Sequence, residues 1–111
     1  MFTLRFARPL AGRSFDLLPR RAQLRFNRAF GPLANHPRTA SAELDVHQLA
    51  GYQNLWTLRI PPWRGIYAID GNDVVFIVFG HRNDVYPRLH SLLPPRGRYI
   101  PAVPTGSPSK G

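Results

Sequence analysis

Three arginines and a tyrosine in the second half of the chain have the chemistry of a phosphate-binding site. Arg59, Arg64 and Arg82 stand where expected β-strands begin or end, and Tyr86 follows four residues after Arg82. A guanidinium group can donate two parallel hydrogen bonds to one phosphate, and a phenol can donate or accept a hydrogen bond. A sheet that gathers these residues on one surface would bind a polyanion, and RNA phosphate is the first candidate.

The charge of the whole chain also indicates an acidic partner. The 111 residues include 15 basic and 6 acidic side chains, for a net charge of +9, and every basic residue except Lys110 is an arginine. Arginine keeps its charge and binds phosphate through a planar fork of donors. Codon usage is an alternative origin of the arginine bias, but the net charge still favours nucleic acid or an acidic protein as partner.

Several classes of protein are excluded or disfavoured by the composition. No cysteine is present, so disulfides and thiolate metal sites are excluded and a cytoplasmic protein is expected. The longest apolar run, Val74–Phe79, has six residues, whereas a membrane-spanning helix needs about 20. The histidines show no metal-ligand spacing. We therefore expect no membrane segment, no metal and no cofactor.

The amino-terminal third is expected to form one strand and two helices. Apolar and other residues alternate over Phe2–Ala7, which is the pattern of a half-buried strand. Pro9–Gly12 is interpreted as a turn, followed by a short helix over Phe15–Leu18. Apolar residues then recur on one face from Arg20 to about Leu33, and Pro19 suits the start of this helix. The second helix should pack on a sheet and leave its arginines largely in solvent.

The rest of the domain is expected to be a connection followed by three antiparallel strands. The connection spans residues 37–54 and includes a possible helical turn near Glu43–Leu49. The strands are expected at Leu55–Ile60, Ile66–Ile69 and Val74–Phe79, with a hairpin turn at Asp70–Asp73. The predicted fold is α+β: a mostly antiparallel four-stranded sheet with two amino-terminal helices packed on it, in the order β-α-α-β-β-β.

One folded domain, residues 1–93, is expected to precede a flexible tail, residues 94–111. The domain should end in a helical turn near Leu89–Leu93. The tail is rich in proline and glycine and has too few apolar residues to form a core. Most of the positive charge belongs to the domain, because the tail holds three basic residues.

The order of these elements and four short motifs resemble the RelE/ParE superfamily of bacterial type II toxins. The motifs are LAG, LWTLRI, WRGIYAID and GHRNDVY, at residues 49–51, 55–60, 63–70 and 80–86. The predicted helical pair, with its proline between the helices, is also similar to that of the family. The resemblance covers roughly residues 2–88, and it depends on the order and spacing of the motifs.

The resemblance implies one scaffold with two possible activities. RelE-like members cleave messenger RNA on the ribosome without a metal, by aligning the ribose 2′-hydroxyl on its own phosphate. ParE-like members inhibit DNA gyrase and are not nucleases. Members of both kinds are held inactive by an acidic antitoxin. Fold alone does not choose between these activities, so the choice must come from the site residues.

The site residues favour RNA cleavage. By resemblance, Arg64 and Arg82 hold phosphate, Arg59 is a basic residue that contacts RNA, and Tyr86 acts on a proton or stacks on a base. An alternative partner for Arg64 is the carboxylate of Asp70 or Asp84.

Two aromatic side chains complete the predicted site. His81 is predicted to carry the proton, because histidine is the residue type that exchanges protons near neutral pH. Trp63 is expected to stack on a base or, alternatively, to cover the core. Two features depart from the family pattern: Thr57 stands where several RelE-like nucleases have a basic residue, and no carboxylate base is evident. His47 stands where some relatives have a glutamate.

We therefore predict the toxin of a type II toxin–antitoxin system, a metal-independent, ribosome-associated endoribonuclease that inhibits translation (an mRNA interferase). Its expected partners are an acidic antitoxin, the ribosome and messenger RNA. Two alternatives remain: a ParE-like, non-enzymatic inhibitor of DNA gyrase, and a non-toxic RNA-binding relative. A proton carrier beside the arginines favours the nuclease over the gyrase inhibitor, which has no need of one.

Overall fold

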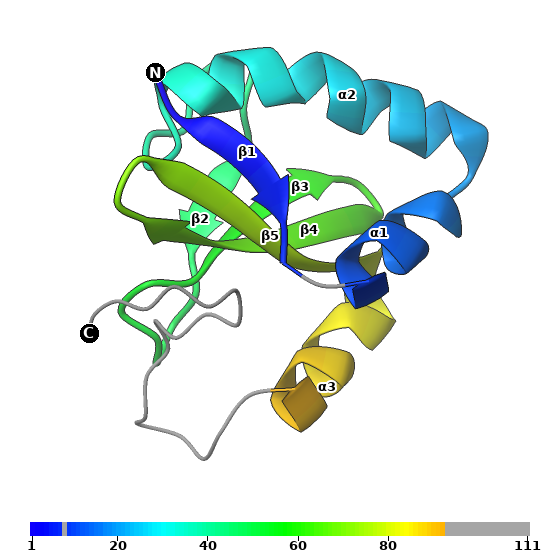
Figure 1. The fold of residues 1–111 in the computed structure, drawn as a ribbon. Coiled ribbons are helices and arrows are strands. Elements are labelled where there is room, and N and C mark those ends of the chain that lie inside the picture. The colour runs from blue at the N-terminus through cyan, green and yellow to red at the C-terminus, as the bar shows by residue number, and fades with distance from the viewer. Residues whose placement is uncertain (8, 93–111) are drawn as a thin grey trace.

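A five-stranded sheet with helices on both sides forms the part of the chain that the computed structural model describes, residues 1–7 and 9–92 (Figure 1). In chain order the elements are β1 (Thr3–Phe6), α1 (Pro9–Asp16), α2 (Arg20–Asn35), β2 (Val46–Gln48), β3 (Trp56–Ile60), β4 (Trp63–Asp70), β5 (Asp73–His81) and α3 (Arg82–Leu92). The predicted α+β class, with two amino-terminal helices and a mostly antiparallel sheet, is confirmed. The predicted tail, residues 94–111, lies outside the described residues.

The strands lie side by side in the order β1-β5-β4-β3-β2. β1 is parallel to β5, whereas β2, β3, β4 and β5 are antiparallel to their neighbours. This order places β3, β4 and the end of β5 together in the middle of the sheet. The predicted site residues come from these strands and from the helix that follows them.

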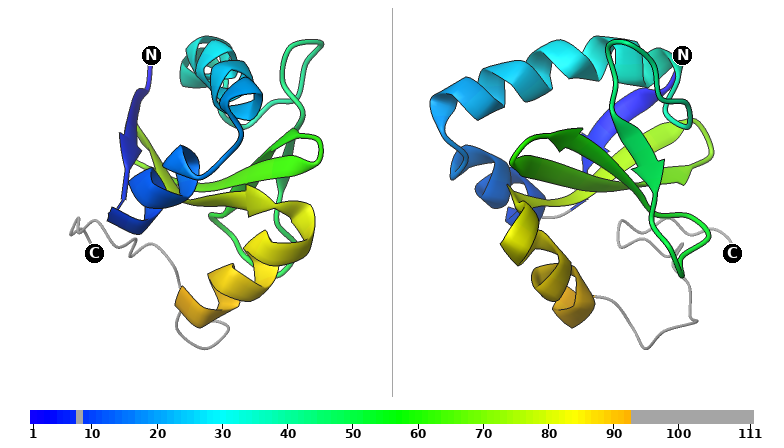
Figure 2. Two further views of the ribbon diagram at one scale, coloured as in Figure 1. Left: turned by 90° about the vertical axis from the view of Figure 1, so that its right-hand side faces the viewer. Right: turned by 180° about the vertical axis from the view of Figure 1, so that it is seen from behind.

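The two faces of the sheet are covered differently (Figure 2). α2 lies over one face, here called the α2 face, where Phe26 and Leu33 pack against Tyr67 and Phe76. α3 lies against the other, here called the α3 face, where Val85 and Leu89 pack with Ile66 and other strand residues. The apolar side chains of β3 and β4 are buried in these two clusters. The polar side chains of the same strands are therefore the ones that face solvent at the open end of the α3 face.

The amino-terminal helix begins earlier than predicted. We expected a turn at Pro9–Gly12 and a helix over Phe15–Leu18, but α1 runs from Pro9 to Asp16. Proline is tolerated in the first turn of a helix because its missing N–H has no partner there. The buried Ser14 then joins α1 to the sheet, since its hydroxyl donates to Ala11 O and accepts the N–H of Phe79, both at 3.0 Å.

The connection between α2 and β3 contains a strand and not the predicted helical turn. Val46–Gln48 form β2, and Val46 pairs with Leu58 of β3. Leu44 and Val46 are buried while Asp45 and His47 are exposed, which is the two-residue period of a strand. The sheet therefore has five strands in place of the predicted four.

The carboxy-terminal helix is longer than the expected turn at Leu89–Leu93. α3 begins at Arg82, directly after β5, and Pro87 lies within it. Neither this helix nor any other among residues 1–7 and 9–92 has the length and apolar character that crossing a bilayer requires.

Candidate functional site

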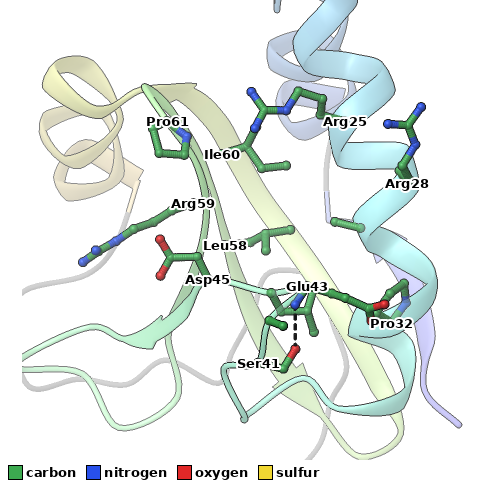
Figure 3. Close-up of a pocket in the computed structure, with 13 residues that line it drawn as sticks. Arg25, Arg28, Pro32, Ser41, Glu43, Asp45, Leu58, Arg59, Ile60 and Pro61 are labelled. Atoms are coloured by element: carbon green, nitrogen blue, oxygen red, sulfur yellow. Dashed lines mark hydrogen bonds between the residues drawn. The ribbon is translucent and has the colours of Figure 1, made fainter.

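Arg59 and Arg64 lie directly opposite each other on neighbouring strands. They are paired in the antiparallel ladder of β3 and β4 and are both half-buried. Directly opposite residues point to the same face of a sheet, with Cβ atoms about 4.5–5.5 Å apart. Figure 3 shows Arg59 pointing away from α2, so both guanidinium groups belong to the α3 face. Like charges in this position repel each other, which makes the pair a ready site for an anion.

Tyr86 of α3 lies over Arg64. An Nη1–H of Arg64 donates a 2.8 Å hydrogen bond to the phenol oxygen, and the guanidinium carbon lies 5.6 Å from the ring centroid. The bond uses a lone pair of the phenol oxygen, so the hydroxyl proton is left to point toward another acceptor. The alternative partners of Arg64, Asp70 and Asp84, do not form ion pairs with it within the described part of the chain.

Arg82 lies at the same end of the sheet. It is the first residue of α3, its side chain is exposed, and its backbone N–H donates to Pro62 O at 2.9 Å. Since β3 ends, β4 begins and β5 ends here, the three predicted arginines are gathered at one end of the sheet. Arg59 and Arg64 share a face there, and Tyr86 joins them.

His81 and Trp63 do not join this group. They are partners in the ladder of β4 and β5, and their rings meet edge to face with centroids 5.4 Å apart. Trp63 packs against the apolar cluster of the α2 face, and neighbouring residues of a strand point to opposite faces, so Arg64 points the other way. The Nδ1 atom of His81 accepts the N–H of Asn83 at 3.1 Å. His81 thus caps the start of α3, and the half-buried Trp63 lies beside the core.

Asp45 and His47 on the edge of the sheet are part of the α3 face. His47 pairs with Thr57, and the N–H of Arg59 donates to the carbonyl oxygen of Asp45 at 2.9 Å. The two side chains are joined by a 2.7 Å contact between His47 Nε2 and Asp45 Oδ1. Sequence reasoning noted His47 and missed Asp45; the signal was their alternation with the buried Leu44 and Val46.

Two polar atoms on this face are buried without a hydrogen-bond partner among the described residues. They are Thr57 Oγ1 and Arg59 Nε. Thr57 is almost completely buried, and its short side chain lies between His47 on β2 and Ile66 on β4. The face around Arg59 is therefore polar, and these two atoms have hydrogen-bonding capacity that no described residue uses. Farther along the same strands the face is covered by the apolar cluster.

A groove that runs between α2 and β3 adjoins this site, because Arg59 and Asp45 are among the residues that line it (Figure 3). It has a volume of about 440 Å³ and contains Arg25 and Arg28 of α2 on one side, with Leu58 and Ile60 of β3 pointing into it. A second hollow of about 500 Å³ continues from Arg25 toward the turn between β3 and β4. This groove is basic but lies mainly on the α2 face, away from Tyr86.

Tyr67 anchors the loop that leads to β2. Its buried hydroxyl donates a 2.6 Å hydrogen bond to Pro37 O. Burial raises the pKa of Tyr67 well above its ordinary value, although the Arg38 charge opposes the shift, so the phenol remains a proton donor to this carbonyl. The loop that carries Asp45 toward Arg59 is thereby tied to the core.

The chain matches known proteins along most of its length. A sequence model of the family described as the ParE toxin of type II toxin–antitoxin systems, parDE, matches residues 5–86. No curated protein matches significantly.

Solved structures of RelE toxins share the fold. The RelBE2 toxin–antitoxin complex from Mycobacterium tuberculosis is 27% identical, with a TM-score of 0.60 and coverage of 73% of this chain and 98% of that one. The isolated RelE toxin from E. coli is 17% identical, with a TM-score of 0.62 and coverage of 84% and 100%. The RelB–RelE complex from Methanococcus jannaschii is 20% identical, with a TM-score of 0.61 and coverage of 73% and 93%. The matched span exceeds half of the chain, and the chain therefore belongs to the ParE toxin family of type II toxin–antitoxin systems, within the RelE/ParE superfamily.

Proposed function

We propose that this toxin cleaves messenger RNA at the surface formed by Arg59, Arg64 and Tyr86, with Arg82 at its border. The observation that carries the proposal is the position of Arg64. This residue lies opposite a second arginine and is hydrogen-bonded to a phenol whose own proton remains to be donated. Two cations and a proton donor around one point fit a phosphodiester as the bound group better than they fit a carboxylate.

The chemistry proposed is an in-line attack by the ribose 2′-hydroxyl on the adjacent phosphorus. The 2′-hydroxyl gives its proton to solvent water, and the 2′-oxygen forms a bond to phosphorus while the bond to the 5′-oxygen breaks, which gives a cyclic phosphate and a free 5′-hydroxyl. The guanidinium groups of Arg59 and Arg64 stabilise the charge that grows on the phosphoryl oxygens. Tyr86 donates a proton to the departing 5′-oxygen. No step requires a metal or a cofactor.

The proposed setting is the ribosome in the cytoplasm, with an acidic antitoxin as the inhibiting partner. The structural neighbours from M. tuberculosis and M. jannaschii are toxin–antitoxin complexes, which supports a partner of this kind. The net charge of +9 favours an acidic protein as well as RNA. Residues 1–93 are proposed to form the toxin domain and residues 94–111 a tail that the reaction does not use.

A protein-directed toxin, such as a gyrase inhibitor, is the second candidate. The match to the ParE family favours it, and so does the position of Thr57, where a hydroxyl group supplies no charge to a phosphate. Such a toxin would need arginines for binding but no proton transfer. The two candidates therefore differ in the chemical ends they leave in cellular RNA.

Inducing the chain in bacteria and mapping the 5′ ends of translated messages tests the proposal. We expect growth arrest and new 5′-hydroxyl ends with the wild-type chain. Arg64→Ala should lower cleavage about tenfold or more, which corresponds to about 1.4 kcal/mol of lost transition-state stabilisation. Arg20→Ala is the matched control, because Arg20 is equally an arginine but lies exposed on α2.

The other possible results of this experiment distinguish the remaining candidates. Growth arrest without new 5′-hydroxyl ends, together with loss of DNA supercoiling activity, would identify the second candidate. If Arg64→Ala cleaves as well as Arg20→Ala and both melt at the wild-type temperature, the proposed site is misplaced. An absence of growth arrest and of cleavage would indicate a non-toxic relative.

A further inference from the structure

The second hollow, beside the turn between β3 and β4, has no part in the proposed reaction. Its volume of about 500 Å³ is within the range of about 300–1,000 Å³ that is usual for ligand pockets. Arg21 and Arg25 of α2 line one side and Pro61, Pro62 and Trp63 the other, and none of the described residues that line it is acidic. We propose that this hollow binds a nucleotide of the message next to the linkage that is cleaved. The inference rests on the proposed function.

Arg21 and Arg25 supply the side of the hollow that binds phosphate. They are four residues apart on α2, so their side chains lie on the same face of the helix, with Cβ atoms about 5–6 Å apart. Both are exposed, and neither takes part in an ion pair within residues 1–7 and 9–92. Two guanidinium groups at this spacing can donate charge-assisted hydrogen bonds to one phosphate.

Trp63 and two prolines supply the side that contacts the base. The Trp63 ring packs against the apolar cluster of the α2 face and meets the ring of His81 edge to face, so it is held in one orientation. It is only half-buried, and Pro61 and Pro62 beside it are exposed. Every base has a flat face that can stack on such a surface. An acidic peptide would use the arginines but has no flat group to stack there.

The hollow is continuous with the proposed cleavage site around the end of the sheet. Arg25 and Pro61 line both the hollow and the groove whose rim includes Arg59. Figure 3 shows Pro61 at the turn, with Arg59 directed to one side and Arg25 on the other. Trp63 directly precedes Arg64 and points to the opposite face of the sheet. An RNA strand bound at Arg59 and Arg64 therefore reaches the hollow by passing over this turn.

The adjoining groove between α2 and β3 is less suited to RNA. It also contains arginines of α2, but Glu43 and Asp45 lie across from them (Figure 3). Carboxylates repel a phosphate at short range. The nucleotide is therefore expected at the Arg21 end of this surface and not at the Arg28 end.

A pair of 2′-O-methyl oligonucleotides separates the hollow from the cleavage site, since the methylated 2′-oxygen cannot attack the phosphorus. A dinucleotide has one linkage, which the cleavage site binds, whereas a hexanucleotide also reaches the hollow. We expect Arg21→Ala/Arg25→Ala to weaken binding of the hexanucleotide about tenfold or more, because two charge-assisted contacts are lost. Binding of the dinucleotide should be unchanged. Fluorescence anisotropy measures the hexanucleotide, and an NMR titration measures the dinucleotide.

Arg20→Ala/Arg28→Ala is the matched control. It removes the same charge from exposed positions of α2 that do not line the hollow. It should bind both oligonucleotides like the wild-type chain. If the arginines of α2 only solvate the surface, which is the alternative explanation, the two double variants should behave alike.

Tryptophan fluorescence reports on the hollow itself, because the chain has two tryptophans, Trp56 and Trp63. In Trp56→Phe all the tryptophan emission comes from Trp63, and a base stacked on this ring should quench it when the hexanucleotide is added. In Trp63→Phe the emission comes from Trp56 and should not change. Trp56 is half-buried beside the same apolar cluster but does not line the hollow.

Purified protein and ribosomes carrying a defined message provide a ribosome assay of cleavage. A contact made equally in the ground state and the transition state affects KM and leaves kcat unchanged. Arg21→Ala/Arg25→Ala should therefore raise KM about tenfold and keep the wild-type kcat, whereas Arg64→Ala should lower kcat. This difference separates a flanking contact from a contact to the reacting phosphate.

The failure of this inference is distinguishable from failure of the proposed function. Equal hexanucleotide binding by the two double variants, or unchanged Trp63 emission, would overturn the inference and leave cleavage at Arg64 in place. Weaker binding of Arg21→Ala/Arg25→Ala to ribosomes without a message would assign the hollow to ribosomal RNA. Weaker binding to the antitoxin alone would assign it to that protein, and both results overturn the inference. If the wild-type chain cleaves no message on the ribosome, the proposed function fails and this inference fails with it.

Discussion

Tyr86, which is hydrogen-bonded to Arg64, contributes in two different ways, to the stability of the fold and to the proposed reaction. Its ring packs beside the apolar cluster of the α3 face, and its oxygen accepts a hydrogen bond from the guanidinium of Arg64. The ring contributes to stability through burial, whereas the hydroxyl matters to the reaction through the proton that it retains. A substitution that removes only the hydroxyl therefore separates the two contributions.

Tyr86→Phe should reduce the rate of cleavage and leave the fold nearly unchanged. We expect a fall in rate of about 100-fold or more, because proton donation to the leaving oxygen is lost. The free energy of unfolding should fall by about 1.5–3 kcal/mol, which is the net value of one hydrogen bond to a charged group. Tyr52→Phe is the control, since Tyr52 is a half-buried tyrosine beside the same cluster. Equal cleavage by the two variants, measured in the ribosome assay, would remove Tyr86 from the reaction.

The position of Arg59 and Arg64 on one face could be predicted from sequence, but the position of His81 could not. The reason is an irregularity in β5. Ile66 pairs with Val78 and Tyr67 with Phe76, so Ile77 is an extra residue in the strand. Ile77 and Val78 consequently belong to the same cluster. From there on, the alternation is reversed, and His81 points to the α2 face. A regular strand would have turned His81 toward Arg64.

The sequence of β5 contains no sign of this bulge. The strand is apolar on both faces from Val74 to Phe79, so an inserted residue does not interrupt any alternation. In β3, by contrast, Arg59 is the one charged residue in a short alternating strand, and its face can be read directly. A bulge of this kind bends the strand and redirects the side chains that follow it.

The close packing of β4 against β5 makes Gly65 necessary. A Cβ atom at this position would lie 2.8 Å from the ring of Phe79 and 3.0 Å from that of Phe76. These two rings are stacked with centroids 4.8 Å apart, so neither can move away without disturbing the other. Gly65 also adjoins Arg64, and the position of that side chain depends on the same packing.

Gly65→Ala should lower the free energy of unfolding by about 1–3 kcal/mol, the usual cost of overpacking a core. Urea denaturation measures the change. Gly31→Ala is the comparison, because a Cβ atom there meets nothing within 4 Å and the residue lies within α2. In a helix interior, this exchange should stabilise by about 0.5–1 kcal/mol. Equal stability of the two variants would contradict the packing argument.

The charge of the whole domain is distributed over two adjoining basic surfaces. Arg59 and Arg64 belong to the α3 face with Tyr86, and Arg25 and Arg28 line the groove beside α2, whose rim also includes Arg59. The sequence predicted the overall charge and the fold class, because both follow from composition and periodicity. It did not predict that the basic residues divide between two sides of the sheet, since that depends on the packing of α2 and on β2 at the sheet edge.

Salt dependence of RNA binding distinguishes a local phosphate site from the general attraction of a basic domain. For single-stranded RNA, each phosphate neutralised contributes about −0.7 to the slope of log K against log salt concentration. The double variant Arg59→Ala/Arg64→Ala should therefore bind a 2′-O-methyl oligonucleotide with a slope shallower by about 1.4. The double variant Arg20→Ala/Arg28→Ala lowers the net charge equally and should keep the wild-type slope, because both arginines are exposed on α2. Fluorescence anisotropy over a salt series measures both slopes. Equal slopes for the two double variants would mean that RNA responds to the charge of the whole domain and not to the paired arginines of β3 and β4.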